Sequence, residues 1–193
     1  MARLVRYLSH PQVVIDPAVP VPCWPLNDEG RARIAALAGS GALTGTTRIV
    51  SSLETKAMDS ALPLARTLGC PLEAYPDMGE NDRSATGFLK GPEFEATADR
   101  FFACPDMSIR GWETARAAQT RIVAAVEREL AKPDTGDLLL VGHGAVGTLL
   151  WCHLTGAPID RKHDQPMGGC TYAFDRGTRQ ARSGWQPMET LFA

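Results

Sequence analysis

Three short apolar runs along the chain have the length of buried strands. They cover residues 3–8, 48–51 and 137–141, and the last consists of Leu138-Leu139-Leu140-Val141 after one aspartate. Apolar runs of four to eight residues, bounded by turn-forming residues, favour strands buried on both faces. Each run is followed by a segment with a helical pattern. This alternation predicts an α/β fold: a three-layer sandwich with a mainly parallel central sheet.

The helices between these strands are predicted from apolar periodicity and from their end signals. Asn27 is a typical N-cap, because Asp28 and Glu29 follow it in the first turn. Pro133 ends the longest helix, and Pro63 is expected to bend another. The predicted helices cover residues 28–38, 53–68, 93–102, 111–132 and 145–154. Segments 170–174 and 181–186 flank Asp175-Arg176-Gly177-Thr178, a composition typical of a hairpin turn.

The length of the chain, 193 residues, fits a single domain spanning residues 1–193. Residues 76–92 are polar and glycine-rich and are predicted as a loop. Together with the helix that follows, they predict a small cap excursion over about residues 76–110. We expect most of the aromatic side chains in and beside this excursion to form its core rather than a platform for substrate: Phe88, Phe94, Phe101, Phe102 and Trp112.

Charge and cysteine content narrow the function classes. The formal net charge is −2, and the 20 lysines and arginines are scattered, which argues against a nucleic-acid partner and against a membrane-binding patch. No apolar segment has the length of a membrane span. The five cysteines are odd in number and form no C-x-x-C pair, as expected of reduced thiols in a cytoplasmic protein. The sequence leaves the oligomeric state open, a homodimer included.

Two of the four histidines lie where predicted strands end. His10 follows the first strand and His143 follows the third, between Gly142 and Gly144. Ligand sites in parallel sheets form at the carboxyl ends of the strands. A histidine held there by one ring nitrogen can attack phosphorus with the other. The amides at the start of the helix after His143 favour an anion. The alternatives are a solvent-facing His10 and a βα turn whose glycines serve packing alone.

His143 also belongs to two other patterns, a glycine-rich motif and a regular spacing of histidines. Residues 142–147 match G-x-G-x-x-G, but a dinucleotide site needs an acidic residue at the end of a second strand. Asp160 and Asp164 have that spacing, yet residues 155–159 are turn-like. The ten-residue spacing of His143, His153 and His163 forms no compact metal motif, so we expect neither a metal nor a cofactor.

The motifs, taken in order, resemble those of the histidine phosphatase superfamily, the phosphoglycerate mutase-like proteins. The resemblance covers nearly the whole chain. Ser9-His10-Pro11 stands where that family has Arg-His-Gly, and Val141-Gly142-His143-Gly144 is similar to its second histidine motif. The remaining segments that carry the resemblance are residues 24–30 (WPLNDEG), 51–57 (SSLETKA) with Ser60-Ala61, and Glu113 in 111–114 (GWET).

The resemblance implies a role for each site residue. His10 would be phosphorylated transiently, His143 would stabilise the transferring phosphoryl group, and Glu80 would be the proton donor, with Asp77 and Asp82 as competitors for that role. The phosphate-binding positions that it implies are Ser9 and Lys56. Gly144 at the helix start and Arg83 in the neighbouring loop are added to them, with a surface arginine as the alternative for Arg83. A carboxyl beside a bound phosphate should have a raised pKa, which suits it to protonate a leaving alcohol.

The departures from the family pattern reduce the charge of the expected pocket. Ser9 and Lys56 replace arginines, which grip phosphate with a planar fork, and Asp16 replaces an asparagine. The sequence therefore predicts a metal-independent phosphatase acting on a small phosphorylated metabolite or a phosphoprotein. The alternative is a degenerate, non-catalytic family member that binds an anionic ligand or a protein partner.

Overall fold

The structure is a computed structural model of the chain, and it describes residues 3–133 and 136–192. Within these residues, six strands form one sheet in the order β3-β2-β4-β1-β5-β6. The strands are β1 (Leu4–Ser9), β2 (Thr46–Ser52), β3 (Leu72–Tyr75), β4 (Asp137–Gly142), β5 (Cys170–Asp175) and β6 (Gln186–Pro187). Strands β1 to β4 pair in parallel, whereas β5 and β6 pair antiparallel. The predicted α/β fold with a mainly parallel sheet is confirmed.

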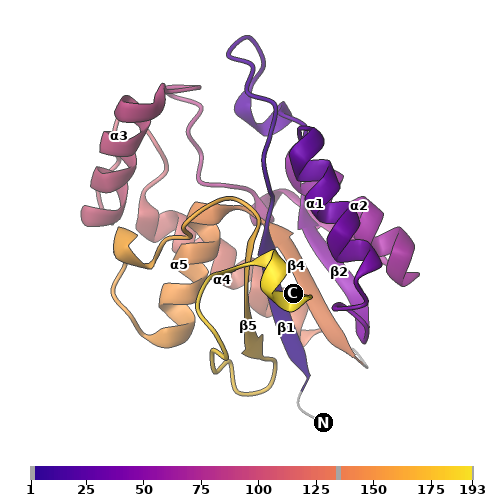
Figure 1. Cartoon of the computed structure of the whole chain (residues 1–193). Helices are drawn as coiled ribbons and strands as arrows, with labels where there is room; N and C mark the ends of the chain where they lie inside the picture. The colour runs from indigo at the N-terminus through magenta and orange to yellow at the C-terminus, as the bar shows by residue number, and fades with distance from the viewer. Residues whose placement is uncertain (1–2, 134–135, 193) are drawn as a thin grey trace.

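Helices cover both faces of the sheet (Figure 1). Helices α1 and α2 lie on one side and α4 and α5 on the other, which gives the predicted three layers. The helices are α1 (Asp28–Gly39), α2 (Thr55–Leu68), α3 (Gly91–Ala103), α4 (Ala115–Ala131) and α5 (Gly144–Thr155). Short 3-10 helices complete the elements: η1 (Val21–Cys23), η2 (Pro76–Met78), η3 (Arg161–His163) and η4 (Met188–Leu191).

The apolar run of strand β4 is unbroken because both faces of this strand are buried. Leu138 and Leu140 belong to the core shared with α3, α4 and α5, whereas Leu139 and Val141 belong to the core under α1 and α2. Successive side chains of a strand point to opposite faces, so a sheet covered on both sides buries every position. All four side chains are at most 1% exposed.

The start of helix α1 is fixed by Asn27 and Gly30. The Asn27 side chain accepts a hydrogen bond from the Gly30 amide at 2.8 Å, which confirms the N-cap. A Cβ atom at Gly30 would lie 2.3 Å from the Gln12 carbonyl oxygen, so only glycine lets the loop after His10 cross the helix start so closely.

Three element predictions were wrong in detail. Strand β3 was missed, because its four residues are all half-buried at the sheet edge and carry no clear alternation. The longest helix begins at Ala115 and not at 111, because Arg110 and Gly111 adopt left-handed backbone angles and Thr114 caps the helix. Residues 181–186 form only an isolated bridge, Phe174 with Ala181, before β6 begins.

The chain between β3 and α4 contains η2, a loop and α3, which lies to one side of the sheet (Figure 1). Phe101, Phe102 and Trp112 are buried in the core shared with α4 and α5, as expected of packing residues. Arg161 of η3 donates to Asp99 at 2.6 Å and to the Glu95 carbonyl at 2.9 Å, which ties α3 to the body.

The single-domain prediction spans residues 1–193, of which 1, 2, 134, 135 and 193 lie outside the described residues. Among the helices of the described residues, none combines the length and apolar character that crossing a bilayer requires.

Candidate active site

The carboxyl ends of β1, β2 and β4 lie side by side at one end of the sheet. Ser9 is in register with Gly142, and Ser51 with Val141. The His10 amide donates to the Gly142 carbonyl at 2.9 Å. As a result, the rings of His10 and His143 lie 5.3 Å apart between centroids, at an angle of 69°. The two histidines predicted at strand ends therefore converge.

The His10 ring is held in one tautomer. Its Nδ1 lies 2.9 Å from the Pro11 carbonyl oxygen, which can only accept, so Nδ1 carries the proton and Nε2 keeps its lone pair. Withdrawal of the ring from water lowers the pKa of His10 to about 4, with Lys56 and Arg83 contributing in the same direction. His10 is therefore neutral at pH 7, the state that a nucleophile requires.

His143 is fixed through its backbone as well as its ring. The Tyr7 hydroxyl accepts from the His143 amide and donates to its carbonyl, both at 3.1 Å. A Cβ at Gly142 would lie 2.4 Å from that hydroxyl, so this glycine serves the packing of Tyr7. On the ring, Nε2 lies 2.9 Å from Ser52 Oγ, whereas the buried Nδ1 has no hydrogen-bond partner among the described residues. Burial lowers the pKa of His143 well below its usual range.

Glu80 lies at the N-terminus of α5. Its carboxylate accepts from the amides of Ala145 and Val146 at 3.3 and 3.1 Å. Burial raises the pKa of Glu80, against the opposing charge of Arg83, and the neighbouring Glu54 adds to the rise. Of the two competing carboxylates, Asp77 pairs with Arg128, whereas Asp82 is exposed and lines the larger of the two cavities described below, not the cavity of His10.

Glu54 contacts most of the charged groups of the site. One carboxylate oxygen accepts from the Glu80 amide at 2.8 Å and lies 3.4 Å from His143 Nε2, and the other accepts from Lys56 at 2.5 Å. Although burial opposes ionisation, His143 and Lys56 hold the pKa of Glu54 at about 2. Lys56 also donates to the Val21 carbonyl at 2.9 Å and is 3% exposed. The lysine charge is therefore already matched inside the protein.

Ser9 is similarly engaged. Its buried hydroxyl donates to Gln165 at 2.5 Å and accepts from the Cys170 amide at 3.0 Å. The Gln165 carboxamide in turn packs on Gly144, where a Cβ would lie 2.4 Å from its nitrogen. Ser9 and Gln165 thus form a neutral hydrogen-bonded pair next to His10 in the chain.

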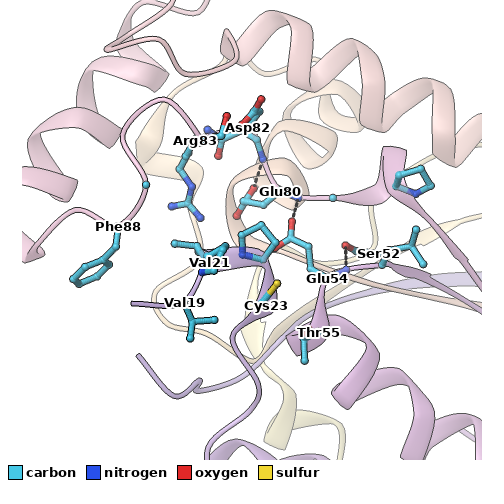
Figure 2. A pocket seen from close by; sticks show the side chains of 18 of the residues that line it. Val19, Val21, Cys23, Ser52, Glu54, Thr55, Glu80, Asp82, Arg83 and Phe88 are labelled. Atoms are coloured by element: carbon cyan, nitrogen blue, oxygen red, sulfur yellow. Dashed lines mark hydrogen bonds between the residues drawn. The ribbon is translucent and has the colours of Figure 1, made fainter. Parts of the chain in front are cut away.

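Two connected cavities open at these residues. The smaller, of about 360 Å³, is lined by His10, Glu80, Arg83, Gly144 and Gln165 among others. The larger, of about 800 Å³, shares Glu80, Asn81 and Arg83 with it and extends along residues 17–23 (Figure 2). The Arg83 guanidinium lies 5.3 Å from the centre of the Phe94 ring and 5.6 Å from that of Trp112.

Of the predicted phosphate ligands, Arg83 and Gly144 line the cavity that contains His10. Ser9 and Lys56 are engaged behind it, and neither lines the two cavities. Asp16 is exposed and caps the Ala18 amide at 2.9 Å.

The remaining sequence patterns lie away from this constellation. His153 is exposed on α5, and His163 packs on Trp151. Residues 156–169, which follow the G-x-G-x-x-G match, contain η3 and no strand. The described residues contain no cluster of three or more histidine, cysteine or acidic side chains able to hold a metal.

Sequence reasoning missed Glu54, Ser52 and Gln165 as site residues. Glu54 carried a usable signal, since it is an acidic residue that directly precedes a helix at a strand end and lies two positions before Lys56. Gln165 had none, because it comes from the irregular segment between η3 and β5.

The comparison with protein families identifies the chain. The sequence model of the histidine phosphatase superfamily (branch 1) matches residues 23–181. The chain belongs to this superfamily. The matched residues begin after His10, so the first histidine segment lies outside that match. A search among curated proteins finds no match to this chain.

Solved structures share the fold at low identity. YhfR of Bacillus stearothermophilus is 16% identical with a TM-score of 0.80, covering 95% of this chain and 96% of its own. A mycobacterial glucosyl-3-phosphoglycerate phosphatase is 18% identical with a TM-score of 0.75, covering 96% of this chain and 97% of its own. The same phosphatase has been solved with inorganic phosphate. At this identity the likeness establishes the fold.

Proposed function

We propose that this chain hydrolyses phosphomonoesters without a metal, through a phosphohistidine on His10. The observation that carries the proposal is the state of His10: a neutral ring, protonated on Nδ1 by its contact with the Pro11 carbonyl and facing a cavity that Glu80 also lines. A small phosphorylated metabolite or a phosphoprotein would supply the ester.

The reaction proceeds in two steps. His10 Nε2 attacks phosphorus, the bond from phosphorus to the ester oxygen breaks, and Glu80 gives its proton to the leaving alcohol. Water then attacks the phosphohistidine and passes a proton to the Glu80 carboxylate, which releases phosphate and restores both residues. The raised pKa of Glu80 suits the first step, because the carboxyl must be protonated when the ester binds.

Arg83, Gly144 and His143 are the proposed stabilisers of the phosphoryl group. Arg83 and Gly144 line the His10 cavity. His143 has a buried ring nitrogen without a protein partner. Such a nitrogen is costly unless a ligand or water satisfies it, and an oxyanion beside His10 would be such a ligand.

The test is turnover of 4-nitrophenyl phosphate with and without a chelator, by wild type and by His10→Ala, with His153→Ala as the matched control. We expect turnover to survive chelation and to persist in His153→Ala. It should fall roughly a thousandfold or more in His10→Ala, because the nucleophile is lost. Acid-labile phosphate should accumulate on wild type and on His153→Ala but not on His10→Ala. Turnover in His10→Ala equal to wild type would contradict the mechanism.

A Glu80→Gln variant separates the proton donor from the nucleophile. Alkyl phosphates need a proton on the leaving oxygen, whereas nitrophenolate leaves without one. We therefore expect kcat/KM, which reports the first step alone, to fall about a hundredfold for alkyl esters and much less for 4-nitrophenyl phosphate. Equal losses on both esters would remove Glu80 from the role of proton donor.

The pairing of Glu54 with Lys56, and of Ser9 with Gln165, favours a second candidate. It is a non-catalytic family member that binds an anionic ligand or a protein partner. Loss of one charged oxyanion contact costs roughly a hundredfold to a thousandfold in rate. If wild type and His10→Ala are equally inert across a broad panel of phosphate esters, this second function replaces the first.

A further inference from the structure

The larger cavity adjoins the cavity of His10. It shares Glu80, Asn81 and Arg83 with the His10 cavity, so a phosphate held beside His10 would extend its ester group into this cleft. A volume of about 800 Å³ matches that of sites that enclose whole small-molecule ligands. The chemistry of the cleft wall therefore bears on the alcohol that the site accepts.

The wall is largely apolar. The lining includes the loop of residues 17–23, rich in proline and valine, together with Leu53 and Phe88 (Figure 2). Leu53 is 55% exposed. An apolar ligand placed here would remove that surface from water.

The shape of the wall is fixed from behind by Trp24. Its indole N–H donates to the carbonyls of Asp16 and Val19 at 2.9 and 3.0 Å, which holds the curvature of the loop. Its ring meets the Phe88 ring edge-on, with centroids 5.4 Å apart. Two segments far apart in sequence thus form one apolar side of the cleft in the absence of ligand.

The charges along the cleft are mostly negative. Glu54 and Asp82 line it as carboxylates, together with Glu80, which is protonated when the ester binds. Arg83 is the one basic side chain among the described lining residues. Arg83 also lines the His10 cavity, where it can serve the phosphate. Outward of that point, a second anionic group on the ligand would meet carboxylates and no further cation.

We infer that the site takes free phosphate monoesters of apolar or aromatic alcohols, and that it rejects esters bearing a second anionic group. This inference rests on the proposed function, because it places the phosphate beside His10. Phe88 then selects for an apolar alcohol, and Asp82 selects against an added carboxylate.

Equilibrium affinities of the His10→Ala protein, which does not depend on turnover, test the inference by calorimetry. We expect 1-naphthyl phosphate to bind at least about tenfold more tightly than glycerol phosphate, a difference of about 1.4 kcal/mol. Phe88→Ala, added to His10→Ala, should abolish this preference, while Met107→Ala, at an exposed position outside the cleft, should keep it. Melting temperatures of both proteins establish that they are folded. Equal affinities for the two esters would overturn the inference.

A second ester pair tests the charge. We expect 4-carbamoylphenyl phosphate to bind roughly tenfold more tightly than 4-carboxyphenyl phosphate, because of repulsion by the cleft carboxylates. Asp82→Asn should narrow this gap, since asparagine can still accept from the Ser84 amide as Asp82 does. Asp106→Asn is the control, at an exposed residue paired with Arg116. If the difference in affinity between the two esters is unchanged in Asp82→Asn, Asp82 does not select against the carboxylate.

The two proposals fail separately. If wild type shows no His10-dependent turnover but these affinity differences hold, the cleft binds apolar phosphate esters and the proposed hydrolysis is wrong. If turnover depends on His10 but the affinities do not differ, hydrolysis stands and the substrate class is wrong.

Discussion

At the scale of single residues, the site depends on which partner each charged or titratable group already has. His10 donates to a backbone carbonyl and remains free to attack. Lys56, by contrast, is matched by Glu54. A residue type in a motif therefore does not establish its role, because a cation that is already paired contributes less to an incoming anion than an unpaired one.

The lowered pKa of His10 makes stability depend on pH. The unfolded ring has a pKa of about 6.5, and the folded ring one of about 4. Between these values the unfolded chain binds a proton that the folded chain does not, so the free energy of unfolding falls as pH drops from 6.5 toward 4. At pH 5, His10 accounts for a loss of about 1–2 kcal/mol in the free energy of unfolding relative to neutral pH.

We expect urea unfolding at pH 7 and pH 5 to show a smaller loss of stability for His10→Ala than for wild type. His153→Ala, in which an exposed histidine of α5 is removed, is the control and should lose stability much as wild type does. Identical losses in all three proteins would mean that His10 is protonated equally in the folded and unfolded chains.

Glu54→Gln should strengthen the binding of inorganic phosphate about tenfold. The substitution removes a charge that repels the anion and keeps one oxygen that can accept from Lys56 or from the Glu80 amide. Calorimetry measures the change, with Glu127→Gln, which removes a carboxylate paired with Arg179 at the surface, as the control. Weaker binding in Glu54→Gln would instead assign Glu54 to holding His143 in position.

At the scale of elements, helix α5 joins packing to the site. Gly147, one turn after His143, would place a Cβ 2.6 Å from Tyr7 and 2.8 Å from Trp185. Tyr7 also bonds the His143 backbone. The glycines around His143 therefore let an aromatic cluster approach the strand and helix that carry the histidine.

Gly147→Ala should destabilise the protein by about 1–3 kcal/mol, because the new methyl group overpacks against two rings. Elsewhere in a helix the same change is favourable, since glycine lowers helix stability. Gly39→Ala provides this comparison in α1, because its Cβ would meet nothing within 4 Å. Urea denaturation measures the free energy of unfolding of both variants. Equal values would show that the aromatic cluster accommodates the methyl group without loss of stability.

The elements with strong local signals could be predicted from the sequence, and those set by long-range packing could not. Strand β4, helix α5 and the Asn27 cap each carry a pattern of their own. Strand β3 exists because it pairs with β2, which no property of its four residues reveals. In the site, the convergence of His10 and His143 follows from strand order. The partner of Ser9 comes from a loop 156 residues away and could not be predicted.

At the scale of the whole molecule, the sheet brings together groups from segments that are distant in sequence. The net charge of the chain is −2, close to neutral. Two basic side chains near the site are paired with carboxylates: Lys56 with Glu54, and Arg161 with Glu95 and Asp99. The local field is thus set by pairs and not by total charge.

The pairing of Lys56 with Glu54 has a kinetic consequence. An anionic ester approaching this cleft meets little net attraction, so diffusion brings it in without electrostatic steering. We expect its association rate constant in stopped-flow fluorescence of naphthyl phosphate to change by less than about twofold between low and physiological salt. In Glu54→Gln the same rate constant should be higher and should fall as salt is added. The pairing of Lys56 with Glu54 therefore predicts that the rate of ligand association depends little on ionic strength.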